Sequence, residues 1–341
     1  MGLLWPYVRF LEMNMFRHIC YAVWAILCLS CSKSLDLGQP VVDVEMFDAD
    51  AEYIIVIGDI QQYTYEEATL PFLEHTMRWI YLAKEAGMNI KCILQVGDIT
   101  QENKKKEWQA FHELTAAVAK EIPYAACTGN HDYSWGDNNE ILSRDNTYFT
   151  KYVTFYGAKA EVVARYEPDR MENIVVRNSI FGASYDILAL EFGPRTEVIE
   201  WANEYVKSNP GIKYILLTHE FLTSDGERVS NGSYAESQLR NTTWSSPEQL
   251  WNTLVAGNDN IACVVCGHNG FSRIRLAAND AGREVPQILF NLQYQVNGGD
   301  GMIEIWEMKE DSDSVNVGVY NTIRNRWVDT PETSFKFKYR Y

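Results

Sequence analysis

The chain contains 341 residues, of which 46% are hydrophobic and 13% aromatic, and its formal net charge is -16. This length and composition allow a large buried core and favour one large α/β domain over two. The acidic charge argues against nucleic acid as a steady partner, because no basic stripe is present to displace counterions from phosphates. A small phosphorylated substrate held through divalent cations is still compatible with it.

Residues 1–31 have the pattern of a signal for export. A short positive start precedes an apolar stretch at 19–29, which is too short to span a membrane comfortably and is followed by Ser30 and Cys31. This boundary resembles that of a bacterial lipoprotein, so we expect a lipidated Cys31 to anchor an exported protein in the periplasm or at the outer membrane or cell surface. An ordinary cleaved signal and an uncleaved amphipathic anchor are the alternatives. Residues 32–46 are expected to form a tether.

From residue 53 the chain alternates between apolar runs and amphipathic stretches. The apolar runs predict strands near 53–57, 90–96, 123–127, 174–181, 184–191, 212–217 and 261–266. The amphipathic stretches predict helices near 66–86, 105–120, 195–207 and 247–256. This alternation requires a mainly parallel core sheet with helices outside it, and later runs indicate antiparallel strands at 287–294, 301–307 and 315–320.

The other segments carry weaker signals. The aromatic segment 133–173 is a candidate lid beside a site, and residues 326–341 are expected to be a C-terminal tail after a domain at 47–325. The cysteines of the domain lie in or beside apolar runs, where buried free thiols are the preferred interpretation: Cys92, Cys127, Cys263 and Cys266.

Polar motifs follow five of the predicted strands. They are Gly58-Asp59-Ile60-Gln61, Gly97-Asp98, Thr128-Gly129-Asn130-His131-Asp132, Thr218-His219-Glu220 and Gly267-His268-Asn269. The carboxyl ends of parallel strands share one edge of a sheet, and carboxylate, amide and imidazole ligands suit Mn, Fe, Zn or Mg. Singly, each aspartate could cap a helix and each histidine could be structural. Five motifs in the same position favour a metal site, with Asp98 as the best candidate to bridge two ions.

These motifs, in this order and at these intervals, resemble those of the calcineurin-like metallophosphoesterase superfamily over roughly residues 50–325. The first motif, ending in Gln61, resembles that of a secreted bacterial branch. The resemblance implies an α/β fold, a four-layer sandwich of two mixed β-sheets flanked by helices, with the site on the edge that the sheets share.

The resemblance also implies a role for each motif residue. Asp59 and Gln61 would serve a first metal, and Asp98 would bridge it to a second. The ligands of the second metal alone would be Asn130, His219 and His268. A metal-activated water would attack phosphorus. His131 would donate to a phosphate oxygen or protonate the leaving group, with Asp132 orienting its ring.

Two departures from the superfamily pattern fall on the first metal. Gln61 stands where a histidine is common, and Gly270 stands where the last motif usually has its second histidine. We therefore expect one or two divalent ions, with the first held weakly.

Candidate substrate contacts carry less specific signals. Arg195 and Arg273 could bind a phosphate, although salt-bridged arginines are commoner, and Tyr133 and Trp135 could shape the pocket or pack beneath a lid. The preferred function is metal-dependent hydrolysis of a phosphate ester in a small molecule. The alternative is a surface metal-containing binding protein of the same fold without turnover, which would not need a proton donor such as His131 beside the metal.

Overall fold

The structure is a computed structural model that describes residues 35–136, 140–141, 143–154, 158–230, 237–239 and 242–339. The chain divides into two units, and the fold described below belongs to the unit Leu37–Tyr341. The expected signal segment 1–31, with Cys31, lies outside the described residues. Within the part of the chain that the structure describes, no helix is both long enough and apolar enough to cross a bilayer.

The first sheet has the strand order β14-β13-β12-β1-β2-β3, with β15 paired to β13. β1, β2 and β3 pair in parallel, whereas β12 pairs antiparallel with β1 and begins an antiparallel half. The strand bounds are β1 Glu52–Ile57, β2 Ile90–Gln95, β3 Tyr124–Ala126, β12 Met302–Met308, β13 Ser314–Asn321, β14 Arg326–Val328 and β15 Ser334–Lys338.

The second sheet has the order β10-β11-β9-β8-β7-β5-β4, with β6 paired to β7. Its centre, from β11 to β7, is parallel, and its two edges are antiparallel. The strand bounds are β4 Val162–Arg165, β5 Ile174–Val176, β6 Ser179–Ile180, β7 Ala183–Ala189, β8 Lys213–Leu217, β9 Ile261–Cys266, β10 Phe271–Ala278 and β11 Glu284–Asn291.

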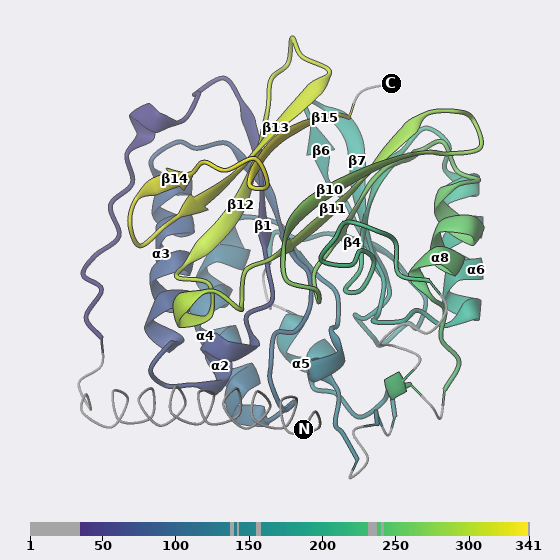
Figure 1. The fold of residues 1–341 in the computed structure, drawn as a ribbon, viewed down its shortest axis with the longest axis horizontal. Coiled ribbons are helices and arrows are strands. Elements are labelled where there is room, and N and C mark those ends of the chain that lie inside the picture. The colour runs from purple at the N-terminus through teal and green to yellow at the C-terminus, as the bar shows by residue number, and fades with distance from the viewer. Residues whose placement is uncertain are drawn as a thin grey trace, which may run out of the picture. The chain divides into compact units, whose positions relative to one another are not determined.

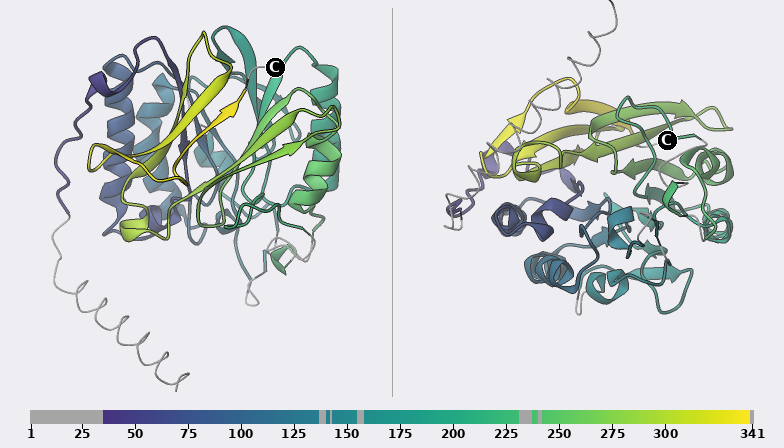
Figure 2. Two further views of the ribbon diagram at one scale, coloured as in Figure 1. Left: turned by 45° about the horizontal axis from the view of Figure 1, so that its top comes forward. Right: turned by 60° about the horizontal axis from the view of Figure 1, so that its bottom comes forward.

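Helices cover the outer faces of the two sheets, which face each other between them (Figures 1 and 2). α3 and α4 lie beside the first sheet, and α6 and α8 lie beside the second (Figure 1). The helical bounds are η1 Val44–Met46, α2 Gln61–Tyr65, α3 Leu70–Glu85, α4 Lys105–Glu121, η2 Asn130–Asp132, α5 Phe149–Val153, α6 Thr196–Ser208, α8 Pro247–Leu250, η3 Trp251–Val255 and η4 Val296–Gly298. The predicted four-layer α/β sandwich of two mixed sheets is confirmed.

The central strands are buried on both faces, which explains why they appear as continuous apolar runs. On β8, Ile215 and Leu217 pack into the core that includes the space between the sheets, while Tyr214 and Leu216 pack into the core beneath α6. Successive side chains of a strand point to opposite faces, so a strand between two cores must be apolar at every position. The cysteines of these runs are buried and free, as predicted.

The expected C-terminal tail is instead part of the first sheet. β14 and β15 both pair with β13, and Phe337 of β15 is buried with its ring centroid 5.1 Å from that of Trp306. Phe335 and Phe337 alternate with lysines, a period of two that places the aromatic side chains on one face of a strand.

The predicted tether and lid also differ from the structure. Leu37, Val42 and Phe47 pack against the hydrophobic core, so only the first residues of the expected tether precede the folded unit. Among the described residues of the candidate lid, Phe149 and Tyr152 are buried in the same core. Their aromatic character therefore reflects packing against the domain.

Candidate metal centre

The predicted ligands follow the carboxyl ends of strands from both sheets. Asp59 follows β1, Asp98 follows β2, and Asn130 begins η2 after β3. His219 and His268 follow β8 and β9 of the second sheet. The centre therefore requires both sheets to be in place.

Asp98, His219 and His268 form a compact group of potential ligands. Each offers one ligand atom, and these atoms lie within 4.8 Å of one another. Asp98 Oδ2 is 3.3 Å from His219 Nε2, and His268 Nδ1 is 3.2 Å from the same nitrogen. The group therefore converges on Nε2 of His219.

The tautomer of His219 explains why this arrangement suits a cation. His219 Nδ1 lies 2.7 Å from the carbonyl oxygen of Val96, which can only accept, so Nδ1 carries a hydrogen, and Nε2 presents a lone pair whenever it is not protonated. That lone pair faces the carboxylate of Asp98 and, at 3.1 Å, Oδ1 of Asn130. A carboxylate and a lone pair repel each other unless positive charge lies between them, so these side chains fit a metal ion.

The pKa shifts have the same origin. Burial lowers the pKa of His219, but the Asp98 and Asp59 carboxylates outweigh burial and raise that pKa to about 10. Burial would raise the pKa of Asp98, yet the imidazoles of His219 and His131 hold it well below its usual range. Burial and repulsion from His219 lower the pKa of His268 to about 3. In the absence of a cation, the positive charge beside Asp98 is therefore a proton on His219, which a metal ion would replace, while His268 is kept neutral, the form that binds metal.

Gln61 adds an unsatisfied oxygen to the centre. Its Nε2 donates to Asp98 Oδ2 at 3.1 Å, while its Oε1 is buried without a hydrogen-bond partner among the described residues. Leaving a buried polar atom unpaired costs about 1–3 kcal/mol. A cation at this oxygen would remove that cost.

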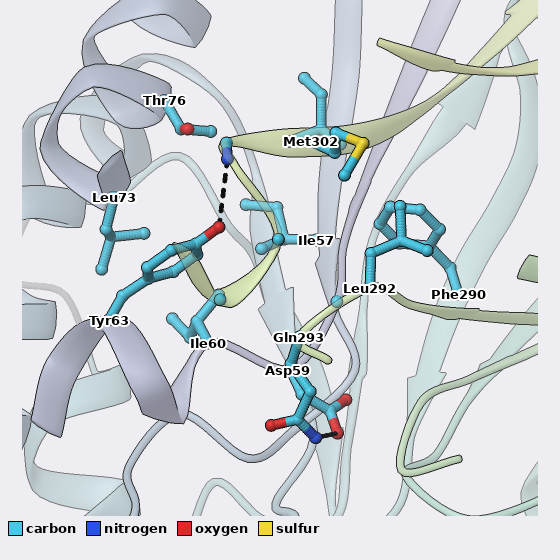
Figure 3. Close-up of a pocket in the computed structure, with 15 residues that line it drawn as sticks. Ile57, Asp59, Ile60, Tyr63, Leu73, Thr76, Phe290, Leu292, Gln293 and Met302 are labelled. Atoms are coloured by element: carbon cyan, nitrogen blue, oxygen red, sulfur yellow. Dashed lines mark hydrogen bonds between the residues drawn. The ribbon is translucent and has the colours of Figure 1, made fainter. Parts of the chain in front are cut away.

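Two amide side chains that sequence reasoning missed hold Asp59. Gln293 Nε2 donates to Asp59 Oδ2 at 3.0 Å (Figure 3), and Asn291 Nδ2 donates to the same oxygen at 2.7 Å. Asp59 Oδ1 accepts from the backbone N–H of His268 at 3.2 Å. Burial raises the pKa of Asp59 well above its usual value, while the imidazole of His219 and the backbone N–H of His268 oppose that rise.

The first subsite thus contains oxygen ligands, from Asp59, Gln61 and Asp98, but no imidazole within the described part of the chain. Gly270 supplies no side chain, and a Cβ built there would lie 2.9 Å from Cδ2 of Tyr294. The mainly apolar cavity beneath Asp59 in Figure 3 has a volume of about 20 Å³. This is room for about one water molecule, so a phosphate ester cannot bind there.

The ring of His131 is held by Gln101, which the sequence analysis also missed. His131 Nδ1 lies 2.9 Å from the backbone carbonyl oxygen of Gln101 and 3.2 Å from its side-chain amide. Asp132 instead accepts from the backbone N–H groups of Gly129, at 2.8 Å, and Thr100, at 2.9 Å. The prediction that Asp132 orients the ring is therefore wrong, because its carboxylate fixes the η2 turn. Burial raises the pKa of Asp132 to about 7, and the Asp98 carboxylate adds to the rise.

Several residues of the centre have left-handed backbone conformations. Asp98 has φ of 45° and His268 has φ of 68°, and such angles cost roughly 1–3 kcal/mol each in residues other than glycine. Gly97 has φ of 96°, and a Cβ there would lie 2.7 Å from the Gly129 nitrogen and 2.8 Å from His219 Nδ1. Only glycine fits at this position, where the ends of three strands approach one another.

Two of the predicted substrate contacts are engaged elsewhere. Tyr133 is fully buried, and its hydroxyl is hydrogen-bonded to that of Thr128 at 2.8 Å. Arg195 forms ion pairs with Glu191 at 2.8 Å and Glu167 at 2.5 Å. The enclosed phenol of Tyr133 cannot reach a substrate. The guanidinium of Arg195 is paired with two carboxylates, and a phosphate contact by it stays a prediction.

The other two contacts have different surroundings. Arg273 donates to the backbone oxygen of Ser272 at 2.9 Å and lies over the ring of Phe271 on β10, and no described contact joins it to the metal centre. Trp135 lies beside the centre: its ring centroid is 5.0 Å from that of His131, and its Nε1 donates to the backbone oxygen of Asn130 at 3.1 Å. Trp135 is therefore suitably placed to contact a substrate, and that contact stays a prediction.

Comparison with known proteins places this geometry in context. The chain is 25% identical over 293 residues to "Uncharacterized protein YvnB" of Bacillus subtilis (strain 168), an alignment that covers 82% of this chain and 21% of that protein. The chain thus spans about a fifth of the length of this curated relative.

Two solved structures are also similar to the chain. Vacuolar Protein Sorting 29 from Cryptosporidium parvum has 10% identity and a TM-score of 0.32, with 84% of this chain and 98% of that chain covered. A protein serine/threonine phosphatase from Saccharomyces cerevisiae, with similarity to human phosphatase PP5, has 9% identity and a TM-score of 0.29, with 87% and 88% covered. TM-scores this low carry no weight in the assignment.

The family model described as Calcineurin-like phosphoesterase matches residues 53–287, which is more than half of the chain. The match runs from β1 into β11 and includes all the motifs that supply the metal centre. Phosphoester hydrolysis with divalent metals is the chemistry of this family, and a group of Asp98, His219 and His268 suits such a metal. The chain therefore belongs to the calcineurin-like phosphoesterase family.

Proposed function

We propose that this protein hydrolyses a phosphate ester of a small molecule with the help of a divalent cation. The observation that carries the proposal is the position of His219 Nε2, which faces the buried carboxylate of Asp98 beside His268. A buried arrangement of this kind is stable only with positive charge at its centre. A bound Mn, Fe, Zn or Mg ion would polarise the phosphate and acidify a water.

The residues have separate tasks in this proposal. Asp98, Asn130, His219 and His268 would hold the cation. The His131 backbone N–H donates to Asp98 Oδ1 at 2.9 Å, which ties the proton-donor loop to the ligand set. Because the Gln101 carbonyl holds the hydrogen on Nδ1 of His131, the substrate would meet Nε2. When protonated, Nε2 would donate to the leaving oxygen.

The proposal favours one firmly held ion over two. The first subsite has an amide at Gln61 and no side chain at Gly270, and Asp59 already accepts from Asn291 and Gln293. Its carboxylates and neutral amide form a weaker site for Zn or Fe than one with imidazoles. A second ion there would exchange readily.

The substitution Asp98→Asn tests the proposal. It keeps the size of the side chain but removes the negative charge, so we expect metal content to fall below 0.1 of the wild-type value and hydrolysis to fall by at least about 100-fold. Metal analysis of the purified protein and a screen of chromogenic mono- and diesters with each of the four metals measure these effects. Asp311→Asn is the matched control, because Asp311 is exposed.

The outcomes separate the proposal from its alternative. Circular dichroism first establishes that the Asp98→Asn variant is folded. Near wild-type hydrolysis by the folded variant would remove Asp98 from the mechanism. A wild-type protein that binds one ion per chain but hydrolyses no ester with any metal would support the binding protein instead.

A further inference from the structure

A cavity of about 430 Å³ opens beside the proton donor of the proposed reaction. Its lining comes from two loops, one after β2 and one at η2, and consists of Gln101, Glu102, Lys104, His131, Ser134 and Trp135. Its volume lies within the range of small-molecule sites. A group bound there would be in contact with the ring of His131, the proton donor of the proposed reaction.

The indole of Trp135 forms a fixed wall of the cavity. Its Nε1 donates to the Asn130 backbone oxygen at 3.1 Å, and its ring packs at 31° to that of His131 with centroids 5.0 Å apart. Since both ends of this pair are anchored, the wall is preorganised. An aromatic wall of this kind binds a planar ring by stacking.

The charges of the cavity are balanced. The ammonium of Lys104 is paired with the carboxylate of Glu102, so apart from His131 itself the lining offers no uncompensated cation for a second phosphate. Ser134 adds a hydroxyl: its Oγ accepts from Asn103 Nδ2 at 2.9 Å, which leaves its own hydrogen to donate. This polar, neutral lining suits hydroxyl groups better than an anionic chain.

We propose that this cavity binds the leaving group of the substrate, and that this leaving group is an uncharged alcohol with a planar ring, such as a nucleoside. This proposal rests on the proposed function for the hydrolysis of a phosphate ester. The identity of the leaving group is inferred from the cavity alone. The ring stacks on Trp135, and the hydroxyl groups meet Ser134, Gln101 and the Glu102–Lys104 pair. Substrates whose leaving group is itself a phosphate are disfavoured.

Trp135→Ala is the first test, with adenosine 5′-monophosphate and glycerol phosphate as substrates. Loss of the wall should lower kcat/KM for the nucleotide, through KM, by about 10-fold more than it lowers kcat/KM for the ringless ester. Trp135→Phe retains a ring and should recover most of the nucleotide activity. Equal losses on both substrates would overturn the proposal, because they would mean that Trp135 only supports Asn130.

Glu102→Gln is the second test. It releases the Lys104 ammonium into the cavity, so hydrolysis of inorganic pyrophosphate should rise about 5-fold or more relative to that of adenosine 5′-monophosphate. Glu67→Gln is the matched control, since it releases Lys106 of the same helix from an exposed pair outside the cavity. The same rise in both variants, or a wild-type preference for pyrophosphate, would overturn the proposal.

Adenosine binding separates this proposal from the proposed function. Calorimetry with adenosine alone should show binding to the wild-type protein and at least about 10-fold weaker binding to Trp135→Ala. Binding without hydrolysis of any ester would contradict the proposed function and leave the cavity assignment standing. Hydrolysis without adenosine binding, or binding unaffected by Trp135→Ala, would contradict the cavity assignment alone.

Discussion

The side chain of Asp132 shows how a single buried carboxylate can fix a functional turn. It is fully buried, and its two oxygens accept from the backbone of Gly129, the backbone of Thr100 and the hydroxyl of Thr100. The turn from Asn130 onward is therefore held on the loop that follows β2. The ring of His131 donates no hydrogen bond to this carboxylate among the described contacts, and its Nδ1 donates to the backbone oxygen of Gln101 instead.

Asp132→Ala should accordingly act on stability. The substitution leaves buried donors without acceptors, and each such donor costs about 1–3 kcal/mol, so we expect the free energy of unfolding to fall by about 2–4 kcal/mol. Urea denaturation measures this loss, and Asp311→Ala is the exposed control, expected to stay within about 0.5 kcal/mol of wild type. Unchanged stability together with a shifted pH–rate profile would show that Asp132 acts on His131 after all.

The first metal subsite gives a second prediction at this scale. Gln61→His with Gly270→His should raise metal content toward two ions per chain, because two imidazoles would join the oxygen ligands of Asp59 and Asp98. The single substitutions should raise it less, and their effects on metal affinity should be more than additive. Tyr294 must turn away from position 270, and its 70% exposure permits this movement.

Metal analysis of the folded double variant tests whether the two histidines raise its metal content. If the double variant binds no more metal than the parent, and the parent already holds two ions, then ligands outside Asp59, Gln61 and Asp98 complete the first subsite. Circular dichroism identifies a variant that has lost its fold, and Gln61→His alone, which does not change position 270, then provides the comparison.

The ligands that directly follow a strand can be predicted from the sequence. The contacts between residues far apart in the chain cannot. Asp59 and Asp98 follow apolar runs directly, so strand and ligand appear together in the chain. Asn291 and Gln293 lie 232 and 234 residues from Asp59, and no local pattern connects them to it. Gln101 lies near Asp98 in the chain, but its main contact with His131 uses a backbone oxygen, which any residue type would provide.

At the scale of elements, strands that are buried on both faces can be predicted from their apolar sequence. Strands with one exposed face are harder to recognise. β1, β2, β8 and β9 are continuous apolar runs because both of their faces are covered. β10 carries polar and charged residues on a partly exposed face, and it was missed although its alternation has the period of a strand. β15 was assigned to a tail for the same reason.

Glu304 marks the contact between the two sheets. It belongs to β12, is fully buried, and accepts from Trp306 Nε1 at 2.7 Å and from the hydroxyl of Ser272 on β10 at 3.4 Å. Burial raises the pKa of its carboxyl to about 8, and these two donors only partly oppose the rise. The folded protein therefore holds a proton on Glu304 at pH values where the unfolded chain has released it.

This proton predicts the pH dependence of stability. Because the folded-state pKa is above the usual value of 4.5, the folded state binds more protons between pH 4.5 and about 8, and stability falls as pH rises through that window. Glu304→Gln cannot ionise, so its stability relative to wild type should increase by at most about 1.4 kcal/mol per pH unit. Urea denaturation of both proteins at pH 5, 6, 7 and 8 measures the difference. A difference that is constant with pH would contradict a protonated Glu304.

At the scale of the whole molecule, the two sheets supply complementary halves of the centre. The first sheet carries Asp59, Asp98 and Asn130, and the second carries His219 and His268. The acidic ligands come from one half and the histidine ligands from the other. Docking of the sheets therefore creates both the core between them and the charge arrangement that calls for a cation.

The amino-terminal segment would determine where the whole molecule resides, and we propose that the mature chain begins at a lipidated Cys31. The apolar stretch 19–29 and the Ser30–Cys31 boundary support this proposal. The folded unit begins at Leu37, so residues 32–36 would connect it to the lipid. Five residues reach at most about 18 Å, so the link between lipid and folded unit would be short.

Cys31→Ser tests the anchor in a native host. Without a thiol to acylate, the protein should move from the detergent-soluble membrane fraction to the aqueous fraction, because in this proposal the diacyl anchor supplies the membrane affinity. Ser34→Ala, three residues away, is the control and should stay with the membrane. Mass spectrometry of the wild-type protein should identify an acylated Cys31 as its first residue. An unmodified amino terminus at another residue, with equal partitioning of wild type and Cys31→Ser, would leave an ordinary cleaved signal as the explanation of this segment.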